Sequence, residues 1–108
     1  MSDFDKFWES LKGGVVDLAK QLGQQYWQAA LQDGNHFLSA QQAQLQRWTV
    51  ELAAGKLSKE EFEDLVMGQK DLAEMVILKQ EGLAQVQIDR FVNGVLNLVI
   101  NTAIEVFL

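Results

Sequence analysis

The chain has 108 residues, 48% of them hydrophobic, and a formal net charge of −6. This length and composition predict one globular domain over residues 1–108, large enough to bury a core but small enough to gain from oligomerisation. The acidic balance, the lack of a basic run and the lack of cysteine argue against nucleic-acid binding, disulfides and thiolate metal sites.

The predicted fold class is all-α. Proline is absent, helix-forming residues dominate, and no stretch alternates apolar and polar residues over the length of a strand. We expect an antiparallel helical bundle of three to four helices, completed by oligomerisation. The expected helices cover about residues 3–33, 35–54, 59–80 and 82–107.

The first expected helix, 3–33, has a start signal and a regular apolar face. Ser2, with Asp5 three residues later, resembles a capping box. Gly14 lies near the apolar face, where it would permit close contact with another helix, and a kink at Gly13-Gly14 is the alternative. The tripeptide Asp33-Gly34-Asn35 is a turn signal, with Gly34 as a helix C-cap, and it predicts the end of this helix. The alternative is a kink within one long helix. The apolar face consists of Phe4, Phe7, Trp8, Leu11, Val15, Leu18, Leu22, Tyr26 and Ala29.

The second expected helix, 35–54, ends at a clear boundary. Gly55 is typical of a residue that terminates a helix, and Ser58 with Glu61 forms a capping box that starts the next one. The residues that share the buried face of this second helix are Phe37, Leu38, Gln41, Leu45, Trp48 and Leu52.

The last two expected helices, 59–80 and 82–107, have apolar faces that point in different directions. On one helical wheel the centre of the apolar face moves by roughly 100° between them. The chain therefore bends near Gly82, or the helix changes its packing partners there. One long bent helix over both segments remains an alternative.

The C-terminal helix is the most apolar part of the chain. Its end is apolar almost all round, so it must be buried, either by its own chain or by a second copy. A ladder of polar residues with four-residue spacing runs along it. These residues either specify the register of a helix–helix contact by hydrogen bonding or lie at the solvent boundary. Its apolar run of about 18 residues is short for a membrane span and contains costly polar groups, so we expect no such span. The ladder consists of Asp89, Asn93, Asn97, Asn101 and Glu105.

Candidate chemical groups are few. His36 is the only histidine and is interpreted as a turn or capping residue. The paired carboxylates at 60–61, 63–64 and 71–74 lie opposite the apolar face, without the Glu-x-x-His motif of di-iron bundles. No nucleotide-binding or metal-binding motif is present. We therefore predict no catalytic residue, no metal site and no cofactor.

Two regions are predicted to make contacts with other molecules. Between Gln21 and Gln46 the only charged side chain is Asp33, and Val16 with two further apolar residues lies off the main stripe. Interfaces are depleted in charge and enriched in aromatic residues. The predicted interaction residues from this region and from the C-terminal helix are Trp27, Leu31, Phe91, Val95, Leu98, Asn97 and Asn101.

The function that these patterns favour is a non-enzymatic, self-associating helical bundle that acts as a structural, scaffold or adaptor protein. We expect a cytoplasmic homo-oligomer, first of all a dimer, with a possible protein partner. One alternative is a surface-active amphipathic protein on a membrane or lipid body, which the acidic charge disfavours for anionic lipid. A second alternative is a bundle that binds a small molecule.

Overall fold

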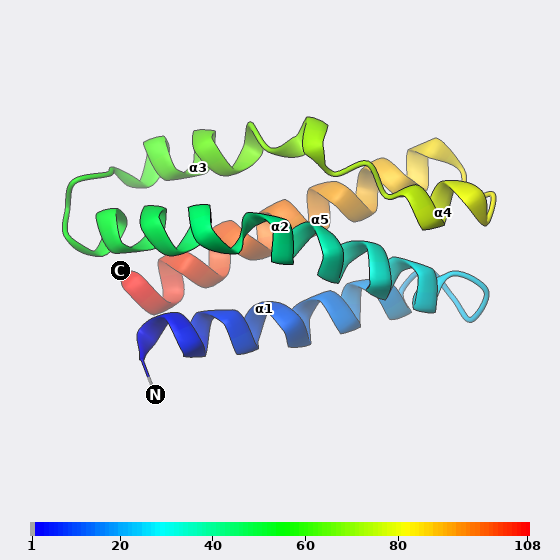
Figure 1. Cartoon of the computed structure of the whole chain (residues 1–108), viewed down its shortest axis with the longest axis horizontal. Coiled ribbons are helices and arrows are strands. Elements are labelled where there is room, and N and C mark those ends of the chain that lie inside the picture. Colours follow the sequence, from blue (N-terminus) through cyan, green and yellow to red (C-terminus); the bar gives the residue numbers. More distant parts are fainter. Residues whose placement is uncertain (1) are drawn as a thin grey trace.

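The computed structural model describes residues 2–108 as helices joined by turns, with no strand among these residues (Figure 1). The predicted all-α class is therefore confirmed. The molecule measures 42 × 27 × 19 Å. Its elements are α1 (Asp3–Lys20), α2 (Trp27–Ala53), α3 (Lys59–Met67), the 3-10 helix η1 (Lys70–Leu72), α4 (Val76–Gln80) and α5 (Gln85–Phe107).

The helix α5 lies at the centre of the packing. It contacts α1, α2 and α3 of the same chain, which lie around it in Figure 1. One side of α5 is a stripe of large apolar side chains that the other helices bury. Full burial of one such side chain contributes about 1.5–3 kcal/mol, so the stripe is a main source of stability. The larger side chains of the stripe that are buried are Ile88, Phe91, Val92, Val95, Leu96, Val99 and Ile100.

The polar ladder of α5 lies at the solvent boundary. Asp89, Asn97, Asn101 and Glu105 are exposed, and Asn93 is half-buried. The ladder thus lies on the outer side of α5, away from the stripe that the rest of the chain buries. At the end of α5 the ring of Phe107 meets that of Phe7, with 5.6 Å between centroids, which joins the end of α5 to the start of α1.

The predicted end of the first helix at Asp33 is wrong. The helix α1 ends at Lys20, and Gly23 then adopts a φ of +91°, a left-handed conformation that is cheap only for glycine. The carbonyl oxygen of Gly23 accepts hydrogen bonds from the N–H groups of Tyr26 and Trp27, at 3.1 and 3.0 Å. The turn that starts α2 therefore forms here, and α2 begins at Trp27 rather than at residue 35.

Gly34 is an interior residue of α2 and not a turn residue. A Cβ atom at this position would lie 2.8 Å from Cγ1 of Val15 and 3.4 Å from Cζ of Phe91. The missing side chain therefore lets α1 and α5 approach α2 closely. The predicted break at Asp33-Gly34-Asn35 is wrong, because Gly34 is a packing residue and not a turn residue. The alternative placed these residues within one long helix, and α2 does continue through them.

The predicted helix over 59–80 is interrupted. The helix α3 stops at Met67, η1 follows, and Met75 adopts a φ of +51° just before the short α4. Gly82 has a φ of +85°, which ends this part of the chain before α5 starts at Gln85. The predicted change of direction near Gly82 is confirmed, whereas the alternative of one long bent helix over both segments is wrong.

The boundary at Gly55 is confirmed. Gly55 has a φ of +75°, and Ser58 caps α3 with the predicted box. The hydroxyl of Ser58 accepts from the backbone N–H of Glu61 at 3.0 Å, and the carboxylate of Glu61 accepts from the N–H of Ser58 at 2.9 Å. The backbone N–H of Ser58 and, after it, the Ser58 side chain lower the pKa of Glu61 below its usual value, because hydrogen bonds to the carboxylate favour its ionised form. Ser2 and Asp5 form the equivalent box at the start of α1.

Candidate functional site

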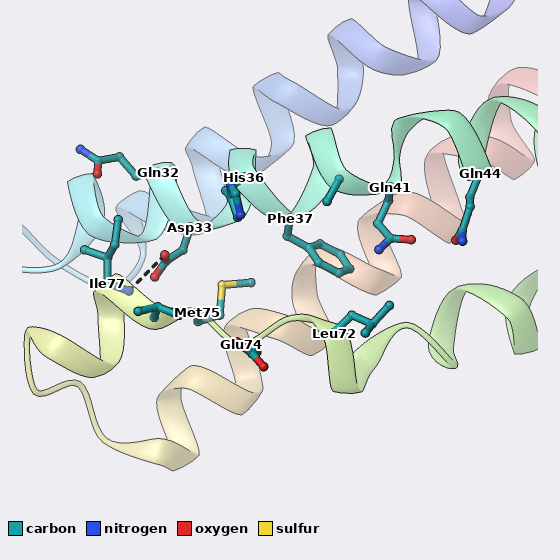
Figure 2. Close-up of a pocket in the computed structure, with 12 residues that line it drawn as sticks. Gln32, Asp33, His36, Phe37, Gln41, Gln44, Leu72, Glu74, Met75 and Ile77 are labelled. Carbon is teal, nitrogen blue, oxygen red and sulfur yellow. Dashed lines mark hydrogen bonds between the residues drawn. The ribbon is translucent and has the colours of Figure 1, made fainter.

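A groove of about 820 Å³ runs between α2 and the segment that connects η1 to α4, and we call it the α2 groove (Figure 2). Its volume lies within the range of about 300–1,000 Å³ that is common for small-molecule sites. The residues that α2 contributes to its lining are Gln32, Asp33, His36, Phe37, Ala40, Gln41 and Gln44. The residues from the other side are Leu72, Glu74, Met75, Val76 and Ile77.

Asp33 holds the two sides of the α2 groove together. Its carboxylate accepts a hydrogen bond from the backbone N–H of Ile77 at 3.2 Å (Figure 2). It accepts a second one from the backbone N–H of Leu78 at 2.7 Å. These N–H groups belong to the first turn of α4 and have no partner within their own helix. Asp33 is only 8% exposed, so a side chain of α2 caps a different helix from a nearly buried position.

The side of the α2 groove opposite α2 is mostly apolar, whereas α2 itself contributes mainly polar side chains together with Phe37 and Ala40. Phe37 and Met75 are buried, whereas Leu72 and Val76 are 62% and 49% exposed. Met75 also carries the left-handed backbone conformation, which is unusual for a residue with a side chain and recurs at binding sites. The arrangement offers an apolar surface that solvent reaches from one side.

Two glutamines of α2 bring unpaired polar atoms to this groove. Oε1 of Gln41 and Oε1 of Gln44 are both buried without a hydrogen-bond partner among the described residues. Gln41 is only 6% exposed. A buried acceptor without a donor costs about 1–3 kcal/mol, so these atoms are energetically suited to a bound donor. The sequence signal was the presence of Gln41 on the buried face of its helix, but its role in a groove was missed.

His36 lies on the exposed side of α2 and at the edge of the α2 groove. The prediction that it is a turn or capping residue is wrong, because Asp33, Gly34 and Asn35 continue the helix. Among residues 2–108, no group of three histidine or acidic side chains is placed to hold a metal ion.

The predicted interaction residues fall into several settings. Trp27 and Leu31 are half-buried on α2, and Leu31 shares a smaller groove of about 300 Å³ with Trp8 and Val16 of α1. We call this second depression the α1–α2 groove. None of the seven predicted residues lines the α2 groove, and their role in association stays a prediction.

The five predicted interaction residues on α5 divide into buried and exposed positions. Phe91 and Val95 are buried in the core of the chain, and Leu98 is half-buried. A Cβ atom on Gly14 would lie 2.5 Å from Cδ1 of Leu98, so the expected close helix contact at Gly14 is confirmed. Asn97 and Asn101 are exposed.

No known protein family, no curated protein and no solved structure matches the chain. Across residues 2–108, none of the helices is both long and apolar enough to cross a membrane.

Proposed function

We propose that this protein is a non-enzymatic binding protein whose α2 groove holds a small amphipathic molecule. The observation that carries this proposal is the pair of buried, unpartnered oxygens of Gln41 and Gln44, two residues that line an open groove of about 820 Å³. Protein interiors normally pair such atoms with a donor. A ligand with a polar group for these oxygens and an apolar body for Phe37 and Leu72 satisfies both kinds of surface.

Blocking the α2 groove is expected to abolish binding of an uncharged apolar dye such as Nile red. The variant Ala40→Trp places an indole where the groove now has a methyl group, and we expect an affinity at least about tenfold lower. Ala53→Trp is the matched control, because Ala53 is an exposed residue at the end of the same helix and does not line the groove. Dye fluorescence titrations measure the affinity, and amide chemical shifts of Phe37 and Met75 report where the dye binds.

The proposal predicts that Ala53→Trp binds the dye like the unmodified protein. Absence of dye binding, or equal binding by the protein and the Ala40→Trp variant, would show that the α2 groove is not a binding site. Circular dichroism of both variants verifies that the helices are intact.

Self-association is the second candidate function, with a second copy completing an antiparallel bundle into a scaffold or adaptor. Leu31 and Val16 come from different helices yet line the same α1–α2 groove, in which Lys12 is the only charged lining residue among those described. A surface depleted in charge suits a protein contact. The partner that fits this surface is a second copy of the chain.

The mass in solution tests this second candidate. Sedimentation velocity over a wide concentration range is expected to show a dimer, and Leu31→Glu is expected to give a monomer because a charge enters an apolar contact. Val50→Glu makes the same kind of change at an exposed position farther along α2 and is expected to leave the dimer intact. A monomeric mass of the unmodified protein at every concentration would rule the dimer out.

A further inference from the structure

The unpartnered oxygens of the α2 groove restrict which ligand it accepts. Figure 2 shows the side chains of Gln41 and Gln44 extending from α2 toward the segment around Leu72. The two residues are three positions apart on one helix, so their side chains are neighbours. Both Oε1 atoms lack a donor among the described residues, and Gln41 is 6% exposed. A ligand group that donates more than one hydrogen bond fits this pair.

The charge around the α2 groove favours a cation. Its described lining residues include two acids, Asp33 and Glu74, and neither lysine nor arginine. The carboxylate of Asp33 is engaged by the N–H groups of α4, but its negative charge remains near the groove. Glu74 is exposed at the rim, and His36 is the remaining titratable group. An anionic head would meet acids and acceptors here.

The apolar walls complete the description of the ligand. Phe37 and Met75 are buried side chains in the lining of the groove, and Leu72 and Val76 add exposed apolar side chains to it. We infer that the α2 groove binds a primary alkylammonium or arylammonium ion. Its head donates hydrogen bonds to Oε1 of Gln41 and of Gln44, and its apolar body lies between Phe37 and Leu72. An ammonium group has enough N–H donors to serve both oxygens. This inference rests on the proposed function, since it names the ligand class of the same groove.

A series of amphiphiles that share one kind of alkyl chain and differ in their head group separates the contributions of hydrogen-bond donors, charge and apolar contact to binding. The probes are n-octylammonium, n-octyltrimethylammonium and n-octanoate, each tested by displacement of Nile red. We expect n-octylammonium to bind at least about tenfold more tightly than n-octyltrimethylammonium, which has the same charge but no N–H donor. We expect n-octanoate to bind more weakly still.

The variant Gln41→Leu tests whether the glutamine oxygen is responsible for this preference. It replaces the amide, with its unpaired oxygen, by an apolar side chain. The fold is therefore expected to persist, and Nile red is expected to bind as before. We expect the preference for n-octylammonium over n-octyltrimethylammonium to fall by at least about fivefold. Gln42→Leu is the matched control, because Gln42 is exposed on the same helix and does not line the groove.

The outcomes distinguish this inference from the proposed function. Dye binding that depends on Ala40, together with equal affinities for the two cations, would keep the binding function and overturn the ammonium assignment. Tighter binding of n-octanoate would overturn it as well. If neither the dye nor any amphiphile binds, both the function and the ligand class fail. A preference that persists in Gln41→Leu would overturn the assignment, because the ammonium head would then not be bound by Gln41.

Discussion

Replacing Asp33 with alanine is expected to lower the free energy of unfolding by about 2–4 kcal/mol and to detach α4 from α2. The substitution removes the acceptor of two backbone N–H groups, those of Ile77 and Leu78. Leu78 is fully buried, so water cannot replace the lost carboxylate without opening the structure. The cost is a large part of the total stability of a domain of this size, which is about 5–15 kcal/mol.

Hydrogen exchange at the amides of Ile77 and Leu78 gives the most direct measurement. Both amides are expected to lose protection in Asp33→Ala, and urea unfolding is expected to show the lower stability. Asp33→Asn retains one carbonyl oxygen, so its amide protection and its stability should lie between those of the unmodified protein and of Asp33→Ala. Asp17→Ala makes the same change at an exposed position of α1 and should have little effect. Unchanged protection in Asp33→Ala would mean that the carboxylate does not hold α4.

Replacing Gly34 with leucine is expected to destabilise the protein by about 2–3 kcal/mol, although leucine is the better helix former. A Cβ atom at this position would already lie 2.8 Å from Cγ1 of Val15. Val15 is fully buried and β-branched, so it has little freedom to move away. The overlap between the new side chain and Val15 can therefore be removed only by a shift of α1 or of Phe91. Such a shift weakens the contact among α1, α2 and α5. Even Gly34→Ala is expected to lower stability.

Gly13 provides the matched control for this substitution. It lies inside α1, and a Cβ atom there would meet nothing within 4 Å. Gly13→Ala is therefore expected to stabilise the protein by about 0.5–1 kcal/mol, the usual helix preference of alanine over glycine. Urea unfolding of the two alanine variants should give changes of opposite sign. Equal changes at Gly13 and Gly34 would show that helix propensity alone decides both positions.

The candidate site was only partly accessible to sequence reasoning. Gln41 was visible as a polar residue on a buried helix face, and Asp33 as the single charge in a long uncharged stretch. Their roles depend on the segment from Leu72 to Ile77, which packs against α2 from a distant part of the chain. No spacing in the sequence indicates that the N–H groups 44 and 45 positions after Asp33 need its carboxylate. The groove was therefore not predicted.

Local chemistry determined the helical class and several boundaries of this protein. The lack of proline, the capping boxes at Ser2 and Ser58, and the turn at Gly55 act within a few residues, so the sequence alone predicted them. The break near Gly82 was also visible, because the apolar face changes direction there.

Tertiary structure alone decided which glycine turns and which one packs. Gly23 and Gly34 have the same intrinsic freedom, but only Gly34 has Val15 and Phe91 against it, and this contact holds it within α2. Tertiary contacts likewise placed the first turn of α4 against the carboxylate of Asp33. These choices depend on atoms that meet only after the helices assemble, which is why local propensity did not reveal them.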